Sequence, residues 1–132
     1  MRIGSVLENQ KIEKRISITP DIVKKYISLG FEIFLSENYG KHIGINDEEY
    51  TKLGAKFSKD DKEILSSSDI IVQLGMLPDE KSSIIKENQI LIGVLNPYEN
   101  KDKLENLAKK KIKLFSLELL PRITRAQSMD IL

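Results

Sequence analysis

The chain has 132 residues, a length that fits one domain with an ordinary hydrophobic core. Its 21 basic and 20 acidic side chains nearly cancel, so no charge excess is available to bind a nucleic-acid backbone. Cysteine is absent and His42 is the single histidine, which excludes disulfides and argues against a zinc site or a catalytic triad. The longest apolar run, 90–95, is too short to cross a bilayer, and no signal-peptide pattern opens the chain, so we expect a cytoplasmic protein.

In the first half of the chain, apolar runs of strand length alternate with amphipathic segments of helix length. Thr19 and Pro20 form the pattern of an N-cap followed by proline at the first helical position, and Gly30 is expected to end that helix. The elements expected, in chain order, are a strand over 2–7, this helix, a strand over 31–35, a helix over 47–53, an extended piece near Phe57 and a helix over 58–68.

The second half repeats the alternation with the most apolar segments of the chain. Pro78 is expected to open a helix, and Asn96-Pro97 is expected to break the chain after a strand. The elements expected, in chain order, are a strand over 69–74, a helix over 78–87, a strand over 89–95, a helix whose apolar face is marked by Leu104, Leu107, Ala108 and Ile112, and a strand over 111–117.

Nearly continuous apolar strands separated by helices predict an α/β domain. Right-handed crossovers then give a doubly wound, mostly parallel sheet with helices on both faces, as in Rossmann or flavodoxin-like folds. No G-x-G-x-x-G and no Walker A sequence is present. Since a dinucleotide pyrophosphate binds to backbone amides at such a glycine-rich turn, this chain cannot supply that turn itself.

The densest polar cluster follows the last predicted strand, where the carboxyl ends of parallel strands line a ligand crevice. It lies in the sequence PRITRAQSMDIL and contains Arg122, Arg125, Gln127, Ser128 and Asp130. None of these side chains is a good proton shuttle near neutral pH, but all can hydrogen-bond an amide, a ribose or a phosphate. The alternative is a solvated helix start with an Arg–Asp pair.

Two other candidates have the same two interpretations. Lys14 and Arg15 precede the first predicted helix and form either a binding group or a solvated loop, and His42 in its glycine-flanked loop is expected to be plain surface. The helix that begins near Arg125 has no C-cap before the chain stops, so we expect the chain to be a fragment of a longer protein.

Four sequence stretches resemble a known family: RIG at 2–4, KRISITP at 14–20, GFEI at 30–33 and PRITRAQSMDIL at 121–132. Over its whole length the chain is similar to the first half of the NAD(H)-binding (alpha) component of proton-translocating NAD(P) transhydrogenases. The region 14–20 is shared with alanine dehydrogenases, within one alanine dehydrogenase/transhydrogenase N-terminal domain family. The stretch R-I-T-R-A-Q-S-M-D is specific to the transhydrogenases.

The resemblance implies a component with two Rossmann-like subdomains and NAD(H) in the cleft between them. This chain matches the first subdomain, and 121–132 would begin the segment leading to a missing NAD-binding subdomain that carries the glycine turn. The implied activity is hydride transfer between NADH and NADP⁺ coupled to proton translocation, with this fragment inactive alone. The implied partners are that subdomain, an NADP(H)-binding component and a membrane component, with a homodimer in the complete component that lies peripheral to the inner or plasma membrane.

The resemblance also implies roles for the terminal cluster. Arg122 and Asp130 would orient the nicotinamide of NAD(H) and its carboxamide, Arg125 would assist in binding the cofactor, and Gln127 would reach toward NADP(H) on the partner component. Direct hydride transfer between two nicotinamides releases no proton, so it needs positioning groups and no general acid or base. No metal is expected.

Two rival interpretations stay open. Alanine dehydrogenases, which the chain also resembles, use a lysine after the strand matching 69–74 and a histidine after the strand matching 89–95. Here Gln73 and Asn96 stand near those places, and only Arg15, which would bind a substrate carboxylate, is present. The second rival is a non-catalytic regulatory or interaction module, because fold alone does not decide function.

Overall fold

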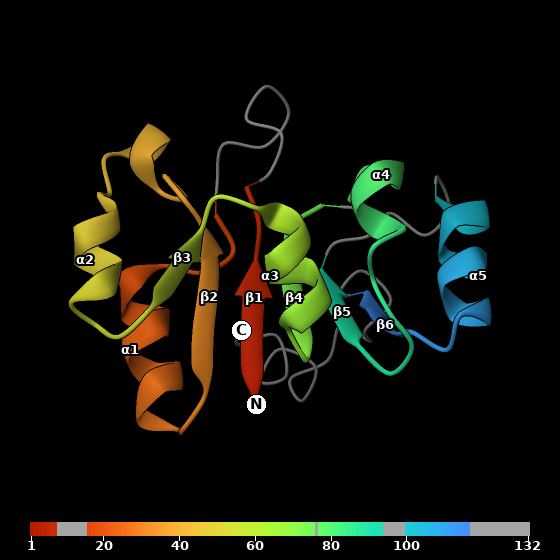
Figure 1. Cartoon of the computed structure of the whole chain (residues 1–132), viewed down its shortest axis with the longest axis horizontal. Helices are drawn as coiled ribbons and strands as arrows, with labels where there is room; N and C mark the ends of the chain where they lie inside the picture. The colour runs from red at the N-terminus through yellow and green to blue at the C-terminus, as the bar shows by residue number, and fades with distance from the viewer. Residues whose placement is uncertain (8–15, 76, 94–99, 117–132) are drawn as a thin grey trace, which may run out of the picture.

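A computed structural model describes residues 1–7, 16–75, 77–93 and 100–116, which form a parallel six-stranded sheet with helices against it (Figure 1). The strands are β1 (Arg2–Ser5), β2 (Glu32–Ser36), β3 (Lys56–Ser58), β4 (Ile70–Gln73), β5 (Ile90–Gly93) and β6 (Lys113–Ser116). The helical elements are α1 (Pro20–Ser28), the 3-10 turn η1 (Lys41–Ile43), α2 (Asp47–Thr51), α3 (Asp61–Ser67), α4 (Asp79–Ser82) and α5 (Lys101–Lys109).

The strand order is β3-β2-β1-β4-β5-β6, with every adjacent pair parallel. The chain starts in the centre of the sheet, winds outward to β3, returns across the sheet through α3, and winds outward again to β6 (Figure 1). This is the doubly wound topology that the alternating sequence pattern predicted, and the prediction of the fold class is confirmed.

Each face of the sheet has its own core. The face we call the α3/α5 face contains the buried side chains of Val6, Phe34, Ile64, Leu65, Ile71, Leu77, Ile85, Leu91, Leu107 and Ile112. The face we call the α1/α2 face contains those of Ile3, Ile18, Val23, Ile33, Leu35, Tyr39, Tyr50, Ala55 and Val72. Successive strand residues alternate between the two faces, which explains why strands buried on both sides are almost continuously apolar.

Helix α1 begins as the sequence predicted. Thr19 has an extended backbone and its side chain accepts a hydrogen bond from the backbone N–H of Ile22 at 3.5 Å, while Pro20 occupies the first helical position. Gly30 follows the helix with φ +94°, a conformation that residues with a side chain rarely adopt. These local signals fix where α1 starts, close to the carboxyl end of β1.

Two predicted boundaries are wrong. The helix expected over 78–87 ends at Ser82, because the next amides bond to carbonyls three residues back and the buried Gln89 side chain accepts from Lys86 and donates to the carbonyls of Leu65 and Ser68. A run of helical spacing was therefore outweighed by tertiary hydrogen bonds.

The second wrong boundary concerns Ile112, which lies beyond α5 instead of on its apolar face. Lys111 has φ +64°, and this left-handed residue ends the helix before Ile112. The Ile112 backbone N–H bonds to the Leu107 carbonyl at 3.2 Å, and its side chain still packs in the α3/α5 core.

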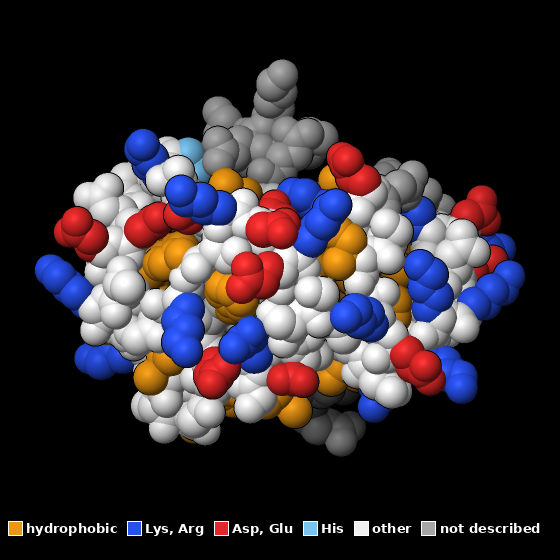
Figure 2. Space-filling model, in the orientation of Figure 1, with side chains coloured by type: hydrophobic (Ala, Val, Ile, Leu, Met, Phe, Trp, Pro, Cys, Tyr) orange, Lys and Arg blue, Asp and Glu red, His pale blue; other side chains and the backbone are white. Residues whose placement is uncertain are grey.

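Helix α3 crosses the sheet where β1 meets β4, and Gly4 allows its close approach (Figure 1). A Cβ atom on Gly4 would lie 2.0 Å from the Ser68 hydroxyl oxygen and 3.0 Å from the side chain of Ile64. Glycine is therefore required here for packing. Over this face of the molecule, side chains of both charge signs are interspersed (Figure 2), so the face shown presents no large surface of one sign.

Candidate functional site at the carboxyl ends of β1 and β4

In an open parallel sheet, ligands bind outside the carboxyl ends of the strands at the point where the strand order reverses. That point lies between β1 and β4, which are neighbours in the sheet although α1, β2, α2, β3 and α3 separate them in the chain. The backbone ladder between these strands has only the pairs Ile3–Ile70 and Gly4–Ile71, whereas β4 and β5 share four pairs. Beyond Gly4 and Ile71, side chains join the two strands.

Gln73, at the end of β4, takes the place of a ladder partner for Val6. Its carboxamide oxygen accepts from the Val6 N–H at 2.8 Å, and its carboxamide nitrogen donates to the Val6 carbonyl at 3.1 Å. The Ser5 hydroxyl donates to the Val72 carbonyl at 2.7 Å. Gln73 and Ser5 are only 2% and 0% exposed, so these bonds satisfy polar groups that water cannot reach.

Two buried tyrosines bind the segment that leads into α1. The Tyr39 hydroxyl accepts from the backbone N–H groups of Ser17 at 3.1 Å and Ile18 at 3.3 Å, and it lies 2.7 Å from the Ser5 hydroxyl. The Tyr50 hydroxyl donates to the Ile18 carbonyl at 2.9 Å. The peptide before the N-cap is thus bound on both sides by side chains from the region that follows β2.

Burial raises the pKa of the Tyr39 phenol above its usual value, and the hydrogen bonds to Ser5 and to the Ser17–Ile18 segment only partly offset this effect. Burial likewise raises the pKa of Tyr50, and nearby acidic groups add to the shift. Both phenols are therefore protonated and uncharged near neutral pH. They can position groups, but they cannot take up a proton from a reacting molecule.

A second hydrogen-bonded chain of groups begins where the polypeptide leaves β1. The Leu7 N–H donates to the Ser36 hydroxyl at 3.1 Å, and that hydroxyl donates to an Asp61 carboxylate oxygen at 2.7 Å. The other Asp61 oxygen pairs with the Lys81 ammonium at 2.9 Å. Because these groups come from β2, α3 and α4, the bonds connect the start of the loop after β1 to both halves of the sheet.

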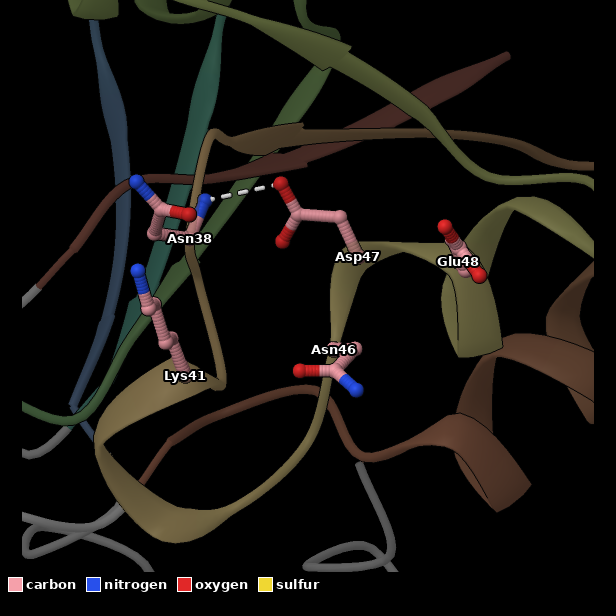
Figure 3. Close-up of a pocket in the computed structure, with 5 residues that line it drawn as sticks. All are labelled: Asn38, Lys41, Asn46, Asp47 and Glu48. Atoms are coloured by element: carbon pink, nitrogen blue, oxygen red, sulfur yellow. Dashed lines mark hydrogen bonds between the residues drawn. The ribbon is translucent and has the colours of Figure 1, made fainter.

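A polar surface hollow of about 280 Å³ lies beside η1 and α2 (Figure 3). An Asp47 carboxylate oxygen accepts from the Asn38 N–H at 3.0 Å and stabilises the left-handed turn at Asn38, where φ is +60°. Among the described residues, no group of three or more His, Cys, Asp or Glu side chains could hold a metal ion. The hollow therefore serves the turn after β2, and the carboxyl ends of β1 and β4 are the stronger candidate site.

The predicted site residues Arg122, Arg125, Gln127 and Asp130 lie outside the described residues, and so do Ser128, Lys14, Arg15 and Asn96. Their predicted roles stay predictions. His42 is exposed in η1, as the sequence indicated. Gln73 is the one predicted position near the reaction chemistry that the structure describes, and it lies at the strand reversal point.

Sequence reasoning missed the two tyrosines and Ser5. Ser5 and Tyr39 are 34 positions apart, and Tyr50 and Ile18 are 32 apart, so no local pattern joins them. One signal was available: a buried tyrosine needs a hydrogen-bond partner for its hydroxyl, and Tyr50 lies within the helix predicted over 47–53. That signal gives no information about which backbone groups the hydroxyls reach.

The family model for the alanine dehydrogenase/PNT N-terminal domain matches residues 4–132. The chain belongs to this family. The first of the parts that make up NAD(P) transhydrogenase subunit alpha in Rickettsia prowazekii is 38% identical over 136 residues, covering 100% of this chain and 36% of that protein. The chain thus spans little more than a third of this relative. Among the described residues, no helix has the length and apolar character to cross a bilayer.

Solved structures of family members have the same fold. A transhydrogenase from Sinorhizobium meliloti superposes with a TM-score of 0.89 at 30% identity, covering 98% of this chain and 39% of that one. An L-alanine dehydrogenase superposes with a TM-score of 0.85 at 20% identity, covering 96% and 34%. The second likeness reflects the shared fold alone. The alanine dehydrogenase/PNT N-terminal domain thus occurs here with a neutral, fully bonded Gln73 at its strand reversal point.

Proposed function

We propose that this chain is the N-terminal subdomain of the NAD(H)-binding component of a transhydrogenase, which transfers hydride between NADH and NADP⁺ coupled to proton translocation. The observation that carries the proposal is the 38% identity, over the whole chain, to a transhydrogenase alpha-subunit protein. The neutral groups at the carboxyl ends of β1 and β4 support it, because direct hydride transfer needs positioning and no proton shuttle.

The described residues fit a supporting role in NAD(H) binding. Ser5, Gln73 and Tyr39 are uncharged, buried and bonded within the chain, so they shape the crevice and leave phosphate binding to other groups. The sequence has no glycine-rich turn for the pyrophosphate. When bound, NADH supplies the hydride. The second NAD-binding subdomain would supply the turn, and without it we expect the isolated chain to bind NADH no more tightly than about millimolar.

The proposal assigns the positioning of nicotinamides to the segment after β6. Arg122, Arg125 and Asp130 would bind NAD(H), and Gln127 would reach NADP(H) on a partner component. The complete component would be a homodimer attached to the membrane through its partners. Isolated residues 1–132 would fold cooperatively, since the described residues form a core on each face of the sheet, but would be inactive alone.

The test is single-turnover hydride transfer in the assembled enzyme, with NADH affinity measured separately. Gln127→Asn keeps the amide and shortens its reach by one methylene, so we expect a fall in rate on the order of a hundredfold with NADH affinity nearly unchanged. Arg122→Ala and Asp130→Asn should weaken NADH binding as well. Asn106→Gln, which changes an exposed amide on α5 by one methylene, is the matched control and should leave both unchanged.

Two outcomes would overturn the proposal. Reduction of NAD⁺ that depends on L-alanine, without transfer to NADP⁺, would identify an alanine dehydrogenase. A complete protein that binds neither nucleotide would identify a non-catalytic module. Wild-type transfer by Gln127→Asn would remove only the assigned role of that residue and leave the function standing.

A further inference from the structure

The peptide of Ser17 and Ile18 is the most completely bonded irregular backbone among the described residues at the carboxyl edge of the sheet. It belongs to no helix and no strand, and Ile18 is only 1% exposed. Buried amides and carbonyls outside regular structure require partners from elsewhere. Tyr39 supplies the acceptor for both N–H groups, and Tyr50 supplies the donor for the Ile18 carbonyl.

The two tyrosines differ in what they connect this peptide to. The Tyr39 oxygen already accepts two N–H groups, and the single Ser5 hydroxyl hydrogen is directed at the Val72 carbonyl, so the phenolic hydrogen must lie between Tyr39 and Ser5. The bonds therefore run without interruption from the peptide before α1, through Tyr39 and Ser5, to the end of β4. Tyr50 ends its chain at Ile18.

The far end of this chain of bonds also meets Gln73. The Ser5 hydroxyl oxygen lies 3.3 Å from the Gln73 carboxamide oxygen, which accepts from the Val6 N–H at 2.8 Å. The start of α1, the end of β1 and the end of β4 are thus joined at one place, the strand reversal point where a nucleotide crevice forms in this topology. Their spacing depends on groups that are buried and fully bonded.

We propose that Tyr39 is a positioning residue for the nucleotide crevice, because its hydroxyl fixes the peptide Ser17–Ile18 against Ser5 and β4 and so sets the distance between the start of α1 and the strand reversal point. This inference rests on the proposed function, since it concerns the same crevice. Tyr39 touches no nucleotide itself. It acts through the backbone of Ser17 and Ile18, and Tyr50 serves only to hold that backbone in the core.

The pair Tyr39→Phe and Tyr50→Phe tests this directly, in the assembled enzyme that contains the chain. Each variant keeps a buried ring and removes one hydroxyl from the same peptide. Three quantities are measured: the thermal midpoint, the NADH dissociation constant, and deuterium exchange of peptic fragments that contain Ser17 and Ile18. We expect both midpoints to fall, and exchange at these two amides to rise at least about tenfold in Tyr39→Phe alone, because that variant removes their acceptor.

The NADH dissociation constant should rise about tenfold in Tyr39→Phe, the effect of losing about one buried hydrogen bond, and stay within about twofold in Tyr50→Phe. Equal affinities in both variants, or slow exchange in Tyr39→Phe, would overturn the positioning role. A wild-type enzyme that does not bind NADH would instead overturn the proposed function. If Tyr39→Phe does not fold, Ser5→Ala cuts the same link from β1 and keeps the ring, and an unchanged affinity there would equally sink the idea.

Discussion

The two faces of the sheet are built from different side chains. The buried core of the α3/α5 face consists of aliphatic residues and Phe34, without a hydroxyl. The α1/α2 face buries Tyr39 and Tyr50, whose rings meet edge to face with centroids 6.0 Å apart, and Tyr50 in turn meets Phe57 at 5.9 Å. Both faces bury apolar surface, but only the α1/α2 core carries phenolic hydroxyls into the interior.

The difference shows how a core can also build a site. An aliphatic core fixes helices against a sheet, as Ile64 and Leu65 do for α3. It cannot satisfy irregular backbone, because it has no donors or acceptors. The tyrosines add apolar ring area and a hydroxyl at the same time, so the α1/α2 face can hold the non-helical peptide Ser17–Ile18 at the edge where ligands are expected.

The largest effect is expected on the α3/α5 face. Leu65 is 0% exposed, and Leu65→Ala should lower the free energy of unfolding by about 2–5 kcal/mol, because it removes packed methyl groups and leaves a cavity. Urea unfolding monitored by circular dichroism measures it. Leu53→Ala, a half-buried leucine on the α1/α2 face, is the matched control and should cost less. Equal losses would mean that the two cores are packed to the same depth.

The next effect concerns hydrogen bonding at the edge. Gln73→Met keeps an unbranched side chain of similar size but leaves the buried N–H and carbonyl of Val6 without their partner, so stability should fall by about 1–3 kcal/mol. The same unfolding experiment measures this change. A Met variant as stable as wild type would show that Val6 finds other partners, and the carboxamide would lose its structural role.

Alkaline pH should weaken the α1/α2 face selectively. Tyr39 and Tyr50 have pKa values raised above 10.0 in the folded state, so the folded protein holds protons that the unfolded chain releases, and stability is lost as pH rises above about 10. The slope should approach about 1.4 kcal/mol per pH unit for each tyrosine. Denaturant unfolding between pH 9 and about pH 11.5 checks it, and Tyr50→Phe should reduce the slope.

The smallest effects are expected from surface ion pairs. Lys81 and Asp61 are less than a third exposed and lie 2.9 Å apart, so Lys81→Met should cost up to about 1 kcal/mol. Lys111 and Glu87 are mostly exposed and 3.6 Å apart, and Lys111→Met should cost almost nothing. Unfolding at low and high salt separates the two, since only the first variant should lose a salt-dependent contribution.

Much of the fold could be predicted because its signals are local. The apolar runs around Ile33, Ile71 and Leu91 predicted the strands, and Thr19-Pro20 marked the start of α1. The prediction was wrong where tertiary bonds overrode periodicity, as at Ser82, where the carboxamide of Gln89 outweighed helical spacing. The Tyr39–Ser5 contact could not be predicted, because only the folded sheet brings the two residues together.

The sequence-based site and the structural site are complementary. Gln127 and its neighbours were identified from residue types and a family resemblance, and they lie outside the described residues. Gln73 was noted only because it stood where a related enzyme family has a lysine, and its bonds to Val6 could not be foreseen. A motif in sequence reports chemistry at a chain position, whereas a buried network depends on strand order.

The two-pair ladder between β1 and β4 has a kinetic consequence. Joining Ser5 to Val72 closes a loop across 67 positions, and the entropy cost of such closure precedes any contact that rewards it. We therefore expect β1–β2–β3 and β4–β5–β6 to form as separate units that join late in folding. Groups along this line should then affect the unfolding rate and hardly the folding rate, so the edge that receives a ligand is the last to form and the first to open.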